Sequence, residues 1–203
     1  MIQESVVDRC VNRLSSHFGS RLYVRPPATA AELAELERAV GYLPRDLVIF
    51  FVTCNGLRIA ADGVEAELHL WRIAEILGLI RECNGAPIVS GFVPIRGDRC
   101  GSRDCLVVAA GPAQGAVIRR DPWVPGAEVL SSSFGAYLDA WTNYLVGTYD
   151  ADGHNYPDDI VAPFDAIVTG RNDDKVKPIR YSEEVQTWLR GLDSAVISGA
   201  DFE

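Results

Sequence analysis

The stretch from Leu43 to Gly56, LPRDLVIFFVTCNG, constrains the fold more than any other part of the chain. Its proline suits the first turn of a helix, where the missing N–H has no partner, and Asp46 complements the positive helix start. Apolar residues then surround most of the helical circumference, so this helix must be buried on several sides. The closing pair Asn55-Gly56 can adopt the left-handed conformation that ends a helix. We therefore expect the central helix of the domain here.

Two further helices are expected before this stretch. The first spans Ile2 to Gly19 and carries an apolar stripe at helical spacing. The stripe consists of Val7, Cys10, Val11, Leu14 and Phe18. The second helix begins at Thr29, whose spacing to Glu32 is that of a capping box, and Gly41 ends it. The chain up to Gly56 is thus predicted to be mainly helical.

Hairpin signals and short apolar runs dominate the sequence after Leu57. The first expected element is a hairpin over 57–70 with its turn at Asp62-Gly63, followed over 71–80 by a short helix or by a strand that runs into one. A strand over 92–96, a polar loop over 97–104 and a buried strand over 105–110 come next. A tight connection over 111–115 leads to a returning strand over 116–120. A loop over 121–126 then precedes a helix that is capped within 131–133 and ends near Gly147. Pro94 places its strand at a sheet edge or at a bulge. Because helices and strands are segregated along the chain, we expect an α+β fold. Its sheet would be largely antiparallel, with short strands packed against the N-terminal and closing helices.

The character of the sequence changes after Gly147. Residues 149–159 are polar and rich in turn formers, whereas Ser182 caps a last expected helix whose first turn holds two glutamates. We expect residues 1–147 to form the α+β domain. Residues 148–203 would be a C-terminal extension docked on the same domain.

The formal net charge of -9 restricts the partners of the chain. An acidic surface repels nucleic-acid phosphates and anionic lipid and attracts basic proteins, or it serves solubility alone. No signal peptide and no apolar run of bilayer length is visible. The five cysteines include no C-x-x-C pair, so we expect reduced thiols. The expectation is a cytoplasmic chain that contacts neither nucleic acid nor membrane.

The sequence contains no motif typical of a catalytic site. His17, His69 and His154 lie in different kinds of segment, and a helix end, a strand and a loop explain them. The acidic residues of 150–159 suggest a calcium loop, but counting from Asp150 neither the sixth-position Gly nor the twelfth-position Glu of an EF-hand is present. We therefore expect no enzymatic activity, no bound metal and no cofactor, with calcium binding by the 150–159 loop as the alternative.

The run from Glu35 to Gly56 resembles the signature of the SUKH superfamily. The matching features are Glu37 to Val40, Gly41, Leu43-Pro44, Phe50-Phe51 and Asn55-Gly56, followed in order by LHLWRIAEIL, FVPIRGD, CLVVAA and SSSFGAYLDAW. The resemblance covers the chain from Thr29 to Gly147. The polar loop GDRCGSRD departs from the family pattern, and the extension after Gly147 is not part of the basic family domain.

The resemblance implies an α+β domain that binds proteins and does not catalyse a reaction. Bacterial members of the family act as immunity proteins that bind and neutralise a cognate polymorphic toxin, and fungal relatives act as regulatory scaffolds. We expect an immunity protein whose partner is a basic toxin domain, because an acidic inhibitor gains association rate by electrostatic steering. Two alternatives stay open. One is a non-catalytic adaptor of the same family, and the other is a small hydrolase or ligand-binding domain.

Partner contacts are expected on exposed loops and acidic positions. The candidate residues are Asp62, Glu65, Glu67, Trp71, Asp98, Asp104 and Trp123. Trp123 would be an aromatic anchor of the kind that interfaces favour. Plain solvation of the acidic residues and core or loop packing of the two tryptophans are the competing explanations.

Overall fold

The computed structural model describes residues 4–60, 68–82, 91–97, 101–121, 124–154 and 187–188, without the side chains of 121 and 124–126. Over these residues the chain forms helices and two antiparallel sheets, one of three strands and one of four. The expected α+β class is therefore confirmed. Within this part of the chain, no helix combines the length and the apolar character that crossing a bilayer requires.

The first two helices lie where the sequence predicts them, except that the first begins at Val6 and not at Ile2. Helix α1 (Val6–Phe18) begins after Ser5, whose side chain accepts a hydrogen bond from the Asp8 N–H, and it buries most of the expected apolar stripe. Helix α2 (Ala30–Val40) carries the predicted capping box between Thr29 and Glu32. It ends at Gly41, which is left-handed with φ 75°. Local hydrogen bonding of this kind is readable from sequence because it involves residues only three positions apart.

Helix α3 (Arg45–Thr53) is the central apolar helix, with two corrections to its expected ends. Pro44 is the N-cap, in extended conformation, and is not the first helical residue. The helix stops because Cys54 is extended, with φ -153° and ψ 133°, so the following Asn-Gly pair does not act as the stop. Leu47, Phe50 and Phe51 are buried as expected.

The pair Asn55-Gly56 instead joins α2 to the start of α4 (Ile73–Glu82). The buried Asn55 side chain accepts a hydrogen bond from the Ile73 N–H at 2.9 Å, and it donates one to Glu32 Oε1 at 3.2 Å. Gly56 has φ 91°, and a Cβ there would lie only 2.8 Å from the backbone nitrogen of Arg72. Only glycine fits so close a backbone approach. The motif thus serves tertiary packing.

The three-stranded sheet has the order β1 (Leu22–Val24), β2 (Leu57–Ile59), β3 (His69–Leu70). Strands β2 and β3 pair antiparallel, as the hairpin signal predicted, while the turn at Asp62-Gly63 lies outside the described residues. Beyond β3, the Trp71 N–H donates to the Ile95 carbonyl at 3.0 Å. This hydrogen bond connects the two sheets.

The second sheet runs in chain order through β4 (Phe92–Gly97), β5 (Arg103–Val107), β6 (Val117–Asp121) and β7 (Val124–Ser131). Strand β4 is an edge strand with a register shift between Pro94 and Arg96, as the proline predicted. Two expected loops are shorter than predicted. Strand β5 already begins at Arg103, and residues 124–126 belong to β7, because cross-strand hydrogen bonding extends into these polar segments.

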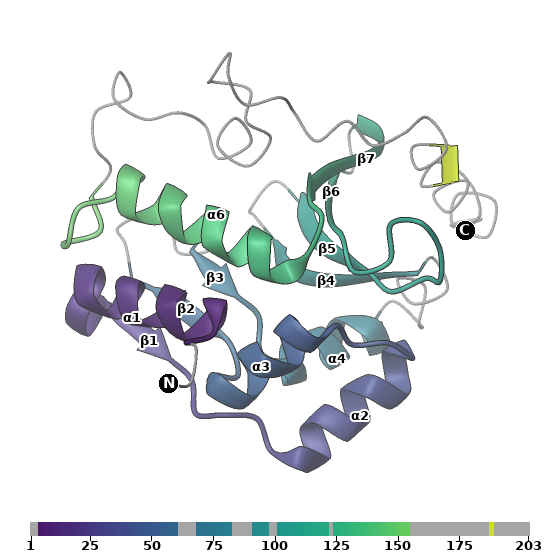
Figure 1. Cartoon of the computed structure of the whole chain (residues 1–203), viewed down its shortest axis with the longest axis horizontal. Coiled ribbons are helices and arrows are strands. Elements are labelled where there is room, and N and C mark those ends of the chain that lie inside the picture. Colours follow the sequence, from purple (N-terminus) through teal and green to yellow (C-terminus); the bar gives the residue numbers. More distant parts are fainter. Residues whose placement is uncertain are drawn as a thin grey trace.

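Helix α6 (Phe134–Thr148) closes the domain and is capped by Ser133. One apolar core joins α1, α3 and α6 to both sheets, and Figure 1 shows α1 and α6 lying one above the other. A smaller apolar cluster covers the other face of the four-stranded sheet, around Phe92, Val107 and Ile118. Trp188 packs against this second cluster, so at least this point of the C-terminal region contacts the domain.

Candidate functional site

The polar side chains most strongly coupled to one another lie in a cross-strand row on the four-stranded sheet. Asp104 on β5 stands opposite Arg96 on β4 and opposite Arg119 on β6. Residues directly opposite in an antiparallel sheet project from the same face, so the row alternates in charge. We call Arg96, Asp104 and Arg119 the covered row, because α6 lies over it. Glu128 on β7 continues the alternation opposite Arg119.

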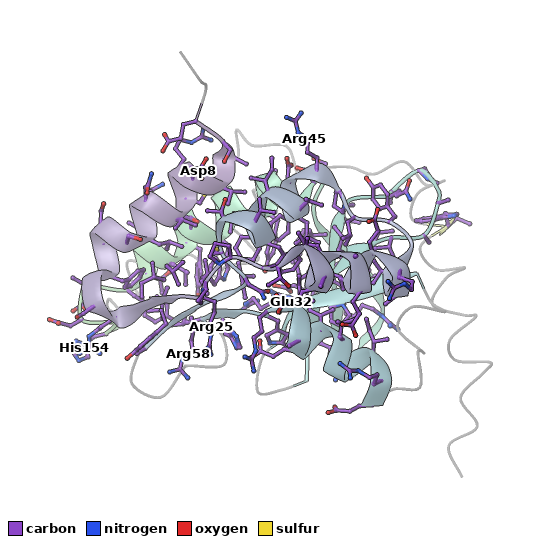
Figure 2. All side chains as sticks on the ribbon, turned by 90° about the horizontal axis from the view of Figure 1, so that it is seen from below. Asp8, Arg25, Glu32, Arg45, Arg58 and His154 are labelled. Carbon is purple, nitrogen blue, oxygen red and sulfur yellow. The ribbon has the colours of Figure 1, made fainter. Side chains whose placement is uncertain are left out.

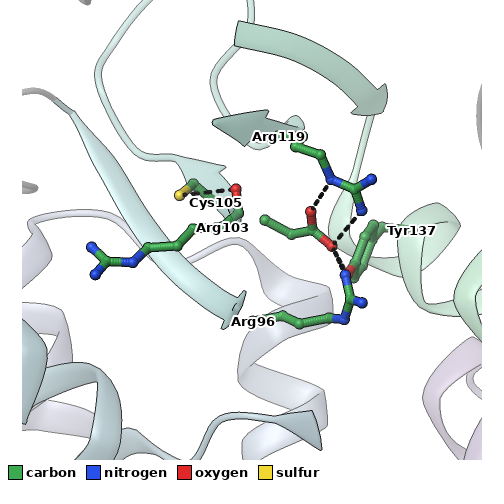
Figure 3. A network of polar contacts seen from close by, with 6 residues as sticks. Arg96, Arg103, Cys105, Arg119 and Tyr137 are labelled. Atoms are coloured by element: carbon green, nitrogen blue, oxygen red, sulfur yellow. Dashed lines mark hydrogen bonds and ion pairs between the residues drawn. The ribbon is translucent and has the colours of Figure 1, made fainter. Parts of the chain in front are cut away.

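Asp104 is the centre of this network, and Figure 3 shows its labelled partners Arg96, Arg119 and Tyr137 converging on one carboxylate. Arg96 donates from Nη1 to Oδ2 at 2.6 Å, and Arg119 donates from Nε to Oδ1 at 2.9 Å. The Tyr137 hydroxyl, brought in by α6, donates to Oδ2 at 2.6 Å. Asp104 is 1% exposed and Tyr137 is fully buried. Short bonds to an ionised acceptor are the strong kind of hydrogen bond, so this row fixes α6 on the sheet.

The charges in the row shift one another's pKa values. Burial alone would raise the pKa of Asp104, but the charges of Arg96 and Arg119 and the bonds from Arg119 and Tyr137 outweigh it and hold that pKa below its usual range. Burial, together with the Asp104 charge, raises the pKa of Tyr137 well above its ordinary value. The carboxylate therefore stays ionised and the phenol stays protonated across the physiological range.

This network is not arranged as a catalytic centre. A general base must reach a proton on a substrate, and a nucleophile must be open to attack. Both Asp104 oxygens already accept hydrogen bonds within the protein, and its side chain has almost no exposed area. Such a buried and satisfied network supports the structure.

A second cross-strand row lies on the outward face of the three-stranded sheet and is partly open to solvent. Tyr23 on β1 stands opposite Arg58 on β2, and Arg58 stands opposite His69 on β3. The alternate positions Leu57, Ile59 and Leu70 are buried in the core, so the row projects outward. Tyr23 is 51% exposed. We call Tyr23, Arg58 and His69 the exposed row.

The exposed row is preorganised by contacts within the protein. The Arg58 guanidinium carbon lies 5.3 Å from the centre of the Tyr23 ring, which is a cation–π contact. His69 Nε2 lies 3.2 Å from Glu75 Oε2. Burial lowers the pKa of His69; Glu75 opposes this effect, while the charges of Arg58 and Arg25 add to it. The imidazole is therefore neutral at pH 7.

Further arginines surround the exposed row. Arg25 follows β1 and is exposed, and Arg72 precedes α4 with its Nε 3.3 Å from Glu75 Oε1. Figure 2 shows the Arg58 side chain pointing away from the ribbon, on the opposite side of the molecule from Arg45. The sheet face thus presents arginine and aromatic groups on a chain whose net charge is -9.

The structure corrects one of the seven predicted contact residues and places another. The expectation that Asp104 lies in an exposed loop is wrong, because β5 starts one residue earlier and buries this side chain beneath α6. Trp71 is partly buried against the main core, and a Cβ at Gly97 would lie 2.9 Å from its ring. The other five candidates, Asp62, Glu65, Glu67, Asp98 and Trp123, lie outside the described residues.

No motif in the sequence points to the exposed row, although the strands contain a signal for it. In LRI and in LYV a polar or aromatic residue stands between two apolar ones, which is the pattern of a strand with one wet face. Three residues per strand are too few for the alternation to be distinctive. The cross-strand register that aligns Tyr23, Arg58 and His69 depends on tertiary pairing and is not written in any one segment.

The acidic loop after α6 uses its first carboxylate internally. Asp150 accepts hydrogen bonds from the N–H groups of Asp152 and His154, each at 2.9 Å, and this lowers its pKa. Residues 155–159 of the proposed calcium loop lie outside the described part of the chain. Across the residues the structure does describe, no group of three or more His, Cys, Asp or Glu side chains is placed to hold a metal ion.

No protein-family model matches the chain, and no curated protein matches it. The resemblance to the SUKH superfamily therefore stays a prediction from the residues that carry it.

Proposed function

We propose that this chain is a non-catalytic protein-binding domain, and specifically an immunity protein that binds and neutralises a cognate bacterial toxin in the cytoplasm of the producing cell. The observation that carries the proposal is the element from Leu43 to Gly56. Its family-like residues occupy specific structural roles in an α+β fold, with Pro44 as a helix cap and Asn55-Gly56 as the junction between α2 and α4. Such roles fit a structural core element whose function is to hold the fold, which leaves partner contacts to the surface around it.

The electrostatics support binding over catalysis. Asp104 and Tyr137, a buried carboxylate with a lowered pKa and a buried phenol with a raised pKa, are bonded to one another inside the domain. Catalytic sites use perturbed groups that face a cleft. The net charge of -9 favours encounter with a basic toxin domain by long-range attraction.

Co-expression with the toxin domain encoded next to this chain tests the proposal. We expect growth rescue and a stoichiometric complex that survives size-exclusion chromatography, because neutralisation requires the toxin's active surface to be covered. An unrelated toxin domain of the same chemistry is the matched control. Absence of both rescue and co-purification would contradict the immunity function for that pair. A complex that co-purifies but does not reduce toxicity would favour the non-catalytic adaptor.

Electrostatic steering of the toxin can be measured separately from binding. If the acidic surface guides encounter, the association rate with the toxin domain falls as ionic strength rises, since the Debye length shrinks from roughly 30 Å at 0.01 M salt to roughly 8 Å at 0.15 M. An association rate that does not change over this range would contradict steering while leaving binding itself intact.

A further inference from the structure

The face of the four-stranded sheet opposite to α6 carries an apolar site that combines large and small side chains. Phe92, Val107 and Ile118 come from β4, β5 and β6, and each is at most 1% exposed. Ala113 and Ala116, in the connection between β5 and β6, are buried beside them. The strands therefore supply an apolar floor, and the small residues of the connection leave room for a large ring.

Trp188 occupies this site. Its side chain is partly buried and packs against the apolar cluster, and Figure 1 shows its short segment in yellow near β6 and β7. The closest approach is at Gly111, where a Cβ would lie 2.3 Å from the indole Cζ2, 2.4 Å from Cε2 and 2.8 Å from Nε1. No side-chain carbon can lie so close to a ring. The nitrogen-bearing edge of the indole thus needs a residue without a side chain at position 111.

The space at Gly111, and not its backbone conformation, is what the ring requires. Gly111 is not among the glycines with positive φ, so alanine can adopt its backbone conformation without strain. Gly115, in the same connection, has φ 87° and is favoured for its backbone conformation. Two glycines four positions apart therefore serve different ends, one the turn and the other the contact with Trp188.

Hydrogen bonds within the connection hold the site in shape. The Gln114 N–H donates to the Gly111 carbonyl at 3.1 Å, and the Gln114 side-chain amide donates to the Val108 carbonyl at 3.1 Å. Neither bond involves Trp188. The site is therefore preorganised, and little conformational freedom is lost when a ring enters it.

We propose that this surface is a binding site for an indole ring, which Trp188 fills from within the same chain and through which the C-terminal region is attached to the domain. A tryptophan ring offers a large rigid contact area for few rotatable bonds, which suits an anchor. Because the ring is only partly buried, a ligand of the same chemistry can enter from solvent once Trp188 is removed. The inference does not rest on the immunity function, since it concerns a contact within the chain.

The first experiment removes the ring and returns it as free indole. Trp188→Ala in the full chain leaves an apolar depression of the kind that takes up small aromatic molecules. Titration calorimetry should show saturable binding with a dissociation constant on the order of 1 mM, as expected for so small a ligand. The wild type should bind indole at least about ten-fold more weakly, because Trp188 already occupies its site.

A matched pair of glycine variants locates the bound indole. Added to Trp188→Ala, Gly111→Ala should weaken indole binding at least about five-fold, since its methyl group lies where the ring would lie. Gly147→Ala is the control, because a Cβ there has no neighbour within 4 Å. Circular dichroism establishes that each variant is folded. A folded Trp188→Ala variant that does not bind indole would overturn the proposal, and so would equal affinities with and without Gly111→Ala.

The second experiment leaves the ring in place and therefore remains decisive if Trp188→Ala does not fold. Arg190 lies two positions beyond Trp188, so trypsin cleavage after it reports release of the anchor. Gly111→Ala alone should accelerate this cleavage at least about five-fold, because the methyl group displaces the indole. Gly147→Ala should cleave at the wild-type rate. Equal rates in the two glycine variants would show that Trp188 is not held through Gly111 and would overturn the assigned site.

Discussion

The two sheets of this protein each carry a row of polar side chains across neighbouring strands, and the rows differ in what lies above them. Arg96, Asp104 and Arg119 are covered by α6, whose Tyr137 adds a fourth group to the network. Tyr23, Arg58 and His69 project outward from the other sheet. Similar residue types in similar cross-strand geometry therefore meet opposite environments.

Arginines in the two rows have different energetic roles. In the covered row, water cannot replace a lost partner, so each charge is held by the others and contributes to a unique packing of α6. In the exposed row, solvent screens every pair and a single lost contact changes stability little. We expect the covered row to determine stability, whereas the exposed row should contribute little to it.

The largest expected effect is that of Asp104→Asn, which removes the charge at the centre of the covered row. Arg96 and Arg119 then lose their shared buried counter-charge, and the free energy of unfolding should fall by about 3 to 5 kcal/mol. Urea denaturation measures it. Asp152→Asn, in a side chain that is 76% exposed, is the control and should stay within about 0.5 kcal/mol. A loss below about 1 kcal/mol for Asp104→Asn would contradict the importance of the covered row.

Removing only the hydroxyl of Tyr137 should give the next largest effect. Tyr137→Phe deletes the 2.6 Å donor to Asp104, and hydrogen bonds to charged groups contribute roughly 1.5 to 3 kcal/mol. Tyr23→Phe serves as the exposed counterpart and should be nearly neutral. A double-mutant cycle with Asp104→Asn sharpens the result, since the Tyr137 effect should shrink when the carboxylate is gone. Strict additivity would show that the two groups act independently.

Asn55→Ala tests whether the loss in the free energy of unfolding depends on burial alone or on belonging to the covered row. Asn55 is buried near the exposed row and accepts from the Ile73 N–H at 2.9 Å. Its loss leaves a buried donor unpaired, which costs about 1 to 3 kcal/mol. Asn12→Ala, which removes an exposed hydrogen bond to Glu4, should cost less. Equal small effects at both positions would argue that burial does not decide the cost.

The features of this fold that the sequence predicts correctly depend on residues that lie close together in the chain. The Thr29–Glu32 capping box, the αL stop at Gly41, the Ser133 cap and the edge placement of the Pro94 strand all depend on residues a few positions apart. Local hydrogen-bonding and backbone restrictions read directly from such spacings.

The parts that sequence missed depend on register and on distant packing. Asp104 looked like a loop residue because Gly and Ser precede it, yet pairing with β4 and β6 draws it into a strand. The Asn55-Gly56 pair looked like a helix stop because that is its commonest local use. Its contacts with Ile73 and Arg72 are 16 to 18 positions away and leave no local trace. The covered and exposed rows were invisible for the same reason.

Arg58→Ala and Arg119→Ala remove one arginine from each row and allow the two stability costs to be compared directly. Each arginine is the cross-strand neighbour of a row partner, but Arg119 bonds to the buried Asp104 whereas Arg58 lies over the half-exposed Tyr23. We expect Arg58→Ala to cost about 0.5 to 1 kcal/mol, the scale of an exposed cation–π contact. Arg119→Ala should cost more. Thermal or urea unfolding measures both variants. Equal losses in the free energy of unfolding would contradict the difference between the covered and the exposed row.

The smallest effect concerns pH and belongs to His69. Its pKa in the folded protein is lowered, first by burial and then by the Arg58 and Arg25 charges, against the opposing influence of Glu75. Between this lowered pKa and the unfolded value of about 6.5, the unfolded chain binds more protons than the folded chain, so stability falls as pH falls. His69→Gln removes this proton linkage. The wild type should therefore lose more stability than the variant between about pH 7 and about pH 5, as measured by urea midpoints. A wild type that gained stability relative to His69→Gln on acidification would show that Glu75 dominates the site, and that the exposed row carries an additional positive charge at low pH.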